Sequence, residues 1–223
     1  MSSDFTILRV DASARRERSL SRALADRFVG EWRARWPDDA WLHRDVGSAP
    51  PPAISEAWIG AAFTAKSERS SQQERLLALS DALIAELRKA DLLLIAAPMY
   101  NYGMPAALKA WVDQVIRVDE TFTFDLDRGD WPLEPTLAGK SLVLLTSSGE
   151  FGFATGGLRA GMDHLTPHLR TLGRYLGVSD TYRVAIEYQE FGDERHRRSV
   201  AAAQADVVGL VEELSERRLS SAA

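Results

Sequence analysis

Three short segments carry the side chains best suited to chemistry, and each follows an apolar run. The first, residues 13–21, holds the hydroxyl groups of Ser13, Ser19 and Ser21 next to an expected helix start. Free backbone N–H groups and the helix dipole favour an anion there by about 0.3–1 kcal/mol. This combination fits a terminal phosphate. The alternative is that Ser19 only caps the helix and that the neighbouring arginines are solvated.

The first segment lacks the familiar nucleotide-binding motifs. It contains neither G-x-G-x-x-G nor G-x-x-x-x-G-K-[ST]. Glycine backbone lies close to the pyrophosphate of a dinucleotide, whereas serine hydroxyls suit the three exposed oxygens of a monophosphate. A phosphatase of similar topology would need a thiol nucleophile, and the chain has no cysteine. The pattern therefore indicates a mononucleotide.

The second segment, residues 99–103, combines an amide side chain with two flat rings. Asn101 can donate and accept hydrogen bonds, and Tyr100 and Tyr102 flank it. These groups suit the edge of a planar heteroaromatic molecule, and the main-chain N–H groups near residues 99–101 are candidates for stabilising negative charge on it. The alternative is that the tyrosines are simply half-buried loop residues.

The remaining polar clusters are weaker. The third segment, residues 147–152, has Ser147, Ser148 and Gly149 but no strong chemistry of its own. His164 and His168 have metal-ligand spacing, but Pro167 interrupts the turn and no H-E-x-x-H pattern is present. We therefore predict no metal site. The basic cluster at residues 195–198 is flanked by acidic residues and fits a solvated helix start.

The elements that must position these segments alternate between strand and helix. The run at residues 92–97 is apolar without alternation, which fits a strand covered on both faces or a buried helical turn, and its short length and the following Pro98 and Gly103 favour the strand. Expected strands are residues 5–10, 41–46, 92–97, 141–147 and 181–188. Expected helices are residues 19–36, 72–89, 105–116, 158–176 with an interruption near Pro167, and 194–218. This order predicts a doubly wound parallel five-stranded sheet with helices on both faces.

The same order predicts where the three segments meet. Because parallel strands end at one edge of the sheet, the three segments should lie together there, in the crevice where such sheets bind ligands. The helix at residues 72–89 should bury Leu76 and Leu79 together with Leu83, Ile84 and Leu87. Residues 121–130 fit a small hairpin or excursion, and residues 53–71 have no clear pattern.

Composition narrows the function further. The chain has 223 residues, and we expect one domain over residues 1–223. A formal net charge of -5 with interspersed signs favours neither nucleic acid nor an anionic membrane as partner. No basic and apolar leader is present, and no apolar run reaches the roughly 18 residues of a membrane span. We expect a soluble cytoplasmic protein, in which any redox chemistry comes from a bound cofactor.

A family resemblance is carried by residues 97–102 with Pro105, Leu108 and Lys109. This stretch resembles the FMN-binding loop of the FMN-dependent NADH:quinone oxidoreductases, also known as azoreductases. The similarity extends through residues 28–33, 79–87, 139–140 and 146–149. It is weakest at residues 150–153, where typical members have a second glycine and a different loop, a departure that bears on substrate preference more than on flavin binding.

The resemblance implies a flavodoxin-like fold and a homodimer with FMN at the subunit interface. By position, it assigns the FMN phosphate to the first segment, the isoalloxazine to the second, and the other edge of the ring to the third. The residues that it implies for cofactor binding are Ser13, Ser19, Leu20, Ser21, Met99, Tyr100, Asn101, Tyr102, Ser147, Ser148, Gly149 and Glu150. No side chain is assigned to catalysis, because the cofactor performs the difficult chemistry.

The reaction expected from this resemblance is a ping-pong transfer of two electrons. NADH or NADPH would donate hydride to flavin N5 and leave, and a quinone or azo compound would take its place over the same ring face. The alternatives are a flavodoxin-type FMN electron carrier, a general NAD(P)H:FMN reductase, and a non-catalytic sensor or scaffold. The aromatic excursion after Val118 favours an enzyme with a substrate pocket and a dimer interface.

Overall fold

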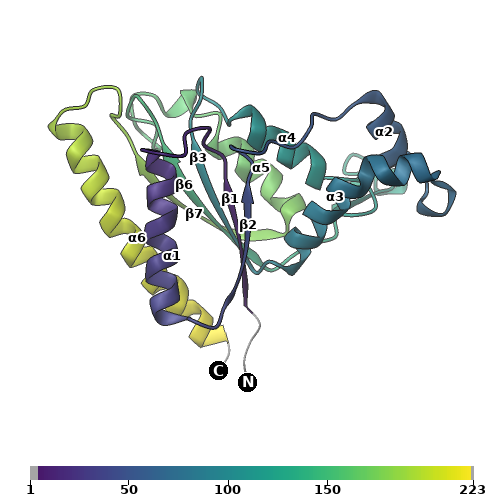
Figure 1. The fold of residues 1–223 in the computed structure, drawn as a ribbon, viewed down its shortest axis with the longest axis horizontal. Helices are drawn as coiled ribbons and strands as arrows, with labels where there is room; N and C mark the ends of the chain where they lie inside the picture. The colour runs from purple at the N-terminus through teal and green to yellow at the C-terminus, as the bar shows by residue number, and fades with distance from the viewer. Residues whose placement is uncertain (1–4, 222–223) are drawn as a thin grey trace.

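A parallel sheet organises the protein, whose computed structural model describes residues 5–221 (Figure 1). The strand order is β2-β1-β3-β6-β7, and all neighbouring strands are parallel. This arrangement confirms the predicted doubly wound five-stranded sheet. The strands are β1 (Thr6–Asp11), β2 (Ala40–Asp45), β3 (Leu92–Pro98), β6 (Lys140–Ser147) and β7 (Val178–Ile186).

Strand β3 shows why its sequence lacks alternation. Successive side chains of a strand point to opposite faces of the sheet. Leu93, Ile95 and Ala97 enter the hydrophobic cluster on one face. Leu92, Leu94 and Ala96 enter the cluster on the other face. Because both faces are covered, every position from 92 to 97 must be apolar, and all six side chains are buried.

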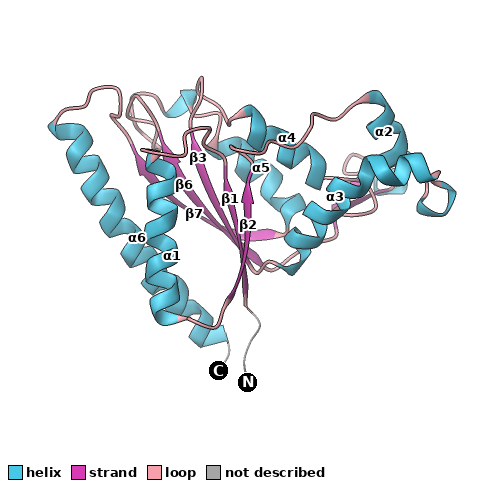
Figure 2. Cartoon of the chain, in the orientation of Figure 1, coloured by secondary structure: helices cyan, strands magenta, loops and turns pink. Residues whose placement is uncertain are grey.

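Helices cover both faces of the sheet. α1 (Leu20–Arg35) and α6 (Glu194–Ser221) run side by side over one face. α3 (Ser71–Lys89), α4 (Ala106–Val115) and α5 (Thr166–Leu176) cover the other face. Figure 2 shows the strands between these two helical layers. Among the described residues, no helix has the length and apolar character needed to cross a membrane.

Two excursions extend from this framework. α2 (Glu56–Phe63) and a 3-10 turn at Lys66–Glu68 fill the region without a clear sequence pattern. α2 packs on α3 through Trp58, Ala61, Ala62 and Leu77, away from the sheet (Figure 1). The expected hairpin is present as β4 (Phe122–Phe124) paired antiparallel with β5 (Leu133–Pro135).

Two sequence predictions about helices were wrong in part. α5 begins at Thr166 and not at residue 158, because Pro167 occupies the first turn and the preceding stretch forms turns and a 3-10 segment. In α3, Leu77 and Ser80 are buried whereas Leu76 and Leu79 are each 37% exposed. The buried stripe runs instead through Leu77, which packs against α2, and Ser80, whose hydroxyl donates to the Gln114 carbonyl of α4 at 2.6 Å.

Candidate functional site

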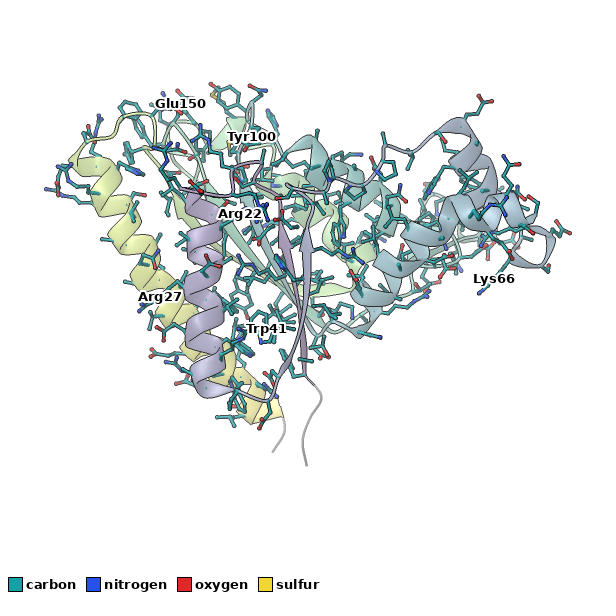
Figure 3. All side chains as sticks on the ribbon, in the orientation of Figure 1. Arg22, Arg27, Trp41, Lys66, Tyr100 and Glu150 are labelled. Atoms are coloured by element: carbon teal, nitrogen blue, oxygen red, sulfur yellow. The ribbon has the colours of Figure 1, made fainter. Side chains whose placement is uncertain are left out.

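The three polar segments lie at the carboxyl edge of the adjacent strands β1, β3 and β6. The Ala12 amide donates to the Ala96 carbonyl at 2.8 Å, which joins the first segment to the end of β3. The Met99 amide donates to the Ser147 carbonyl at 2.8 Å, which joins the second segment to the third. Figure 3 shows Arg22, Tyr100 and Glu150 along this edge. The predicted convergence of the three segments is therefore found in the structure.

The first segment gathers its serines at the start of α1. Ser13, Ser19 and Ser21 are all buried, and the Oγ atoms of Ser19 and Ser21 lie 3.4 Å apart. Ser19 caps the helix, with its Oγ accepting from the Arg22 amide at 3.5 Å. The backbone amides of Leu20 and Ser21 have no hydrogen-bond acceptor among residues 5–221. The segment thus offers hydroxyl groups and two free amides to an anion.

Arg22 holds the first segment from beneath. Its side chain is 11% exposed, and its Nη2 donates to the Ser13 carbonyl at 2.7 Å. The same guanidinium pairs with Asp45 at 2.5 Å and lies 3.3 Å from the Asp11 carboxylate. Burial lowers the pKa of Arg22, but the hydrogen bond to Asp45 and the nearby carboxylates raise it above its usual value. Arg22 is therefore a fixed cation under the loop.

One acidic partner of Arg22, Asp45, is held in the charged form. Burial raises the pKa of Asp45, but hydrogen bonds from Arg22 and Ser48 outweigh it and bring the pKa down to about 2. Oδ2 of the buried Asp11 lies 2.8 Å from His43 Nε2 and 2.9 Å from an Arg9 guanidinium nitrogen. Oδ1 of Asp11 has no hydrogen-bond partner in the described part of the chain. These ion pairs fix the backbone that leads into the serine loop.

Gly47 lies directly against the same loop. A Cβ atom at Gly47 would lie 2.1 Å from the Ser13 carbonyl oxygen, so the loop occupies the space that any side chain would need. The Gly47 amide also donates to the Asp11 carbonyl at 2.9 Å. The close approach requires glycine here.

The second segment is a tight turn. The Tyr100 amide donates to the Gly103 carbonyl and the Gly103 amide donates to the Tyr100 carbonyl, both at 3.0 Å. Asn101 and Tyr102 have φ values of 48° and 64°, in the left-handed region that non-glycine residues rarely adopt. The amides of Met99 and Tyr100 are thus already engaged. Among residues 5–221, the amides of this turn without an acceptor are those of Asn101 and Tyr102.

The third segment is tied to the second through Glu150. The Tyr102 hydroxyl donates to Glu150 Oε2 at 2.9 Å, and the guanidinium of Arg159 lies 3.1 Å from Glu150 Oε1. The hydrogen bond to Glu150 and its negative charge raise the pKa of Tyr102. Ser148 Oγ donates to the Glu150 carbonyl at 3.0 Å, which shapes the turn. Ser147 is buried at the end of β6.

In the third segment, Gly149 packs against the chain that follows β7. A Cβ atom there would lie 2.5 Å from Cγ of Glu190. The amides of Gln189 and Glu190 donate to the carbonyls of Ser148 and Gly149 at 3.2 and 3.1 Å. The segment is consequently held on both sides, by the second segment and by the chain after β7.

The aromatic residues near the third segment and in the hairpin have different surroundings. Phe153 is buried with its ring 6.4 Å from that of Tyr102, and Phe151 stacks on Tyr188 at 4.4 Å. Phe124 and Trp131, in the hairpin, are 53% and 74% exposed. Phe153 and Phe151 therefore belong to the neighbourhood of the site, and the hairpin aromatics are available for contacts elsewhere.

Sequence reasoning missed Arg22, Gly47 and Arg159. Arg22 follows the serine pair in a helical pattern, where a polar residue normally indicates the solvated face. Glycine at position 47, directly after a strand, was the available signal for close backbone approach. His164 precedes α5 and His168 lies within it, and no metal-binding cluster of His, Cys, Asp or Glu occurs in residues 5–221.

The sheet order and the serine loop after β1 together define a protein with the flavodoxin-like fold. The family described as having that fold matches residues 6–210. The chain belongs, within this fold, to the family of FMN-dependent NADH:quinone oxidoreductases, as its sequence resemblance implied. It is 52% identical to FMN-dependent NADH:quinone oxidoreductase 2 of Idiomarina loihiensis over 94% of this chain and 90% of that protein.

Further relatives agree. The chain is 42% identical to FMN-dependent NAD(P)H:quinone oxidoreductase 1 of Pseudomonas aeruginosa, over 89% of this chain and 98% of that protein. An azoreductase structure from Bacillus anthracis Sterne has a TM-score of 0.82 at 18% identity, covering 94% of this chain and 99% of that one. A Bacillus anthracis Ames Ancestor azoreductase solved in complex with FMN has the same TM-score at 15% identity and the same coverage. The structural likeness concerns the fold.

Proposed function

We propose that this chain binds FMN at the carboxyl edge of its sheet and transfers two electrons from NADH or NADPH to quinones and to aromatic azo compounds. Membership of the family makes FMN the cofactor and NADH the expected electron donor. The observation that carries the proposal is the buried Ser19–Ser21 pair with two free amides, beside a turn that presents two further free amides. These features fit the two ends of one mononucleotide.

The first segment suits the phosphate of FMN. The hydroxyls of Ser13, Ser19 and Ser21 and the amides of Leu20 and Ser21 would donate to its oxygens. The α1 dipole favours the negative charge, and the guanidinium of Arg22 lies 2.7 Å from the Ser13 carbonyl, just below. These residues bind and orient. No side chain of the segment needs to exchange a proton.

The second and third segments suit the isoalloxazine. The residues that would line it are Met99, Tyr100, Asn101 and Tyr102 on one side and Ser147, Ser148, Gly149 and Glu150 on the other. When bound, FMN supplies the acceptance and release of a hydride equivalent. The free amides of Asn101 and Tyr102 would donate to a ring atom that becomes more negative on reduction, which is preorganised electrostatic stabilisation.

The proposed ping-pong sequence requires the nucleotide and the acceptor to use the same face of the bound ring. Tyr100 and Tyr102 are each 38% exposed, so flat substrates have aromatic surface to stack upon. The nucleotide and the acceptor would use this surface in turn. The cytoplasm, where reduced nicotinamide is produced, is the expected place of action.

We further propose a homodimer with FMN near the interface. Phe63 on α2 is 74% exposed, and Leu126 and Trp131 in the hairpin are 73% and 74% exposed. Large apolar side chains gathered on excursions are typical of interaction surfaces. Sedimentation analysis should give twice the 24.7 kDa chain mass, and Phe63→Asp should shift the protein toward the monomer.

Steady-state NADH consumption with a quinone tests the enzymatic activity. The FMN-loaded protein should oxidise NADH at a rate that saturates with quinone. A flavodoxin-type carrier would consume no NADH. A general NAD(P)H:FMN reductase would instead require free FMN as a second substrate. Either result would contradict the proposed function.

A further inference from the structure

An open depression lies beside the three segments, between the start of α1 and the chain after β7. Its volume is about 610 Å³, within the roughly 300–1,000 Å³ common for small-molecule sites. The residues that line it are Arg15, Glu17, Arg18, Leu20, Gln189 and His196. We call it the Arg15–Arg18 depression.

The cations of this depression lack the partners that neighbouring arginines have. Within the part of the chain that the structure describes, the guanidinium groups of Arg15 and Arg18 make no hydrogen bond or ion pair. Several other arginines nearby are paired with carboxylates, namely Arg9 and Arg22 with Asp11, Arg195 with Asp193, and Arg197 and Arg198 with Glu194, whereas Arg16, like Arg15 and Arg18, has no such partner among the described residues. Glu17 is the one acidic lining residue, so the lining has a positive balance.

The depression adjoins the proposed FMN site. Leu20 directly follows the capping Ser19, so one wall is the serine loop itself. The Gln189 amide donates to the Ser148 carbonyl at 3.2 Å, so the opposite wall is fixed to the third segment. A ligand with one end over the ring and an anionic end elsewhere could therefore span both places.

We propose that the Arg15–Arg18 depression binds the phosphate groups of the nicotinamide dinucleotide that supplies the electrons. Guanidinium groups form paired, charge-assisted hydrogen bonds with phosphate oxygens, and two unpaired ones can engage a diphosphate or a phosphate monoester. The inference rests on the proposed function. The pyrophosphate occurs in NADH and NADPH, whereas the ribose 2′-phosphate occurs only in NADPH.

Calorimetry on the FMN-saturated protein tests this without any redox reaction. The probes are ADP-ribose, which carries the pyrophosphate, and its 2′-phosphorylated form. The double variant R15A/R18A should bind at least one probe about tenfold more weakly. The matched control R197A/R198A removes the same charge from two arginines already paired with Glu194 and should change affinity less than twofold.

Comparing the loss of affinity for the two probes shows whether the depression binds the pyrophosphate or the 2′-phosphate. An equal loss for both probes assigns the depression to the pyrophosphate, and a loss confined to the 2′-phosphorylated probe assigns it to the monoester. The proposal is overturned if wild type binds neither probe, if R15A/R18A binds both as wild type does, or if the control loses as much affinity. It is also overturned if R15A/R18A weakens only FMN binding, because the arginines then serve the cofactor phosphate.

Circular dichroism of both variants confirms that they fold. Because neither probe contains nicotinamide, binding can be measured even if the wild type fails to oxidise NADH. Failure of the proposed function and failure of this inference therefore give separate results.

Discussion

The Tyr102 hydroxyl donates a hydrogen bond to Glu150 Oε2 at 2.9 Å, linking the turn after β3 to the loop after β6. The hydrogen bond to Glu150 and its charge raise the pKa of Tyr102, since a phenolate beside a carboxylate is disfavoured. Glu150→Gln should therefore bring the pKa of Tyr102 down toward its usual 10.0. NMR titration of ring-labelled tyrosine measures this. Tyr182, whose pKa is raised mainly by burial, is the internal control and should not change. An unchanged Tyr102 titration would show that the bond is absent in solution.

If the first segment binds the FMN phosphate, removing the Ser21 hydroxyl should weaken FMN binding strongly. Ser21 is fully buried, and its Oγ lies 3.4 Å from that of Ser19. Ser21→Ala should remove a hydrogen bond to a charged group, which costs about 1.5–3 kcal/mol and weakens FMN binding roughly 10- to 150-fold. Flavin fluorescence titration measures the dissociation constant. Ser220→Ala, which changes a serine bonded to the Glu216 carbonyl on α6, is the control and should bind FMN normally. Wild-type affinity in S21A would exclude Ser21 from the phosphate site.

A side chain at position 47 should displace the backbone of the serine loop and so weaken FMN binding. In Gly47→Ala the new methyl group would meet the Ser13 carbonyl oxygen at 2.1 Å, so the serine loop must move. Overpacking of this kind costs about 1–3 kcal/mol of stability, and we expect FMN affinity to fall by about tenfold or more. Urea unfolding and FMN titration measure the two effects. Gly60→Ala in α2, where nothing lies within 4 Å of the added Cβ, should leave FMN affinity unchanged.

The lowered pKa of Asp45 should make the free energy of unfolding depend on pH. Its pKa is about 2 in the folded protein and near its ordinary 3.8 when unfolded. A lowered carboxylate pKa stabilises the fold above pH 4, and this contribution disappears as the pH falls from about 4 to 2. Partial hydration keeps it below about 2 kcal/mol. Urea unfolding at several pH values should show a steeper loss for wild type than for Asp45→Asn over that interval. Equal slopes would mean that Asp45 is not paired with Arg22 in solution.

The sheet and the convergence of the three segments could be predicted because the apolar run at residues 92–97 is short and is followed by Pro98 and Gly103, which favours a strand buried on both faces. Local patterns failed where a tertiary contact decided the outcome. Ser80 lies on the buried stripe of α3 with Leu77, Ile84 and Leu87, and its hydroxyl donates to the Gln114 carbonyl, so a search for apolar residues alone passes over this position. Arg22 occupies a helical position that normally faces solvent, yet Asp11 and Asp45, from two different strands, enclose it.

In the turn after β3, the sequence likewise could not predict which backbone amides are free. The sequence indicated main-chain donors near residues 99–101. Only the fold reveals that Met99 donates to Ser147 and that Asn101 and Tyr102 adopt left-handed conformations with their amides free of acceptors among residues 5–221. Family resemblance supplied the identity of the cofactor, which residue types alone narrowed to a mononucleotide.

The central claim is that FMN held by the three segments passes electrons from nicotinamide to a quinone. The most direct test follows the visible absorption of protein-bound FMN without oxygen, in two separate steps. Stoichiometric NADH or NADPH should bleach the absorption, and a quinone added after removal of the oxidised nucleotide should restore it fully. A protein that takes up no FMN, or whose bound FMN is not bleached by either nucleotide, would contradict the account.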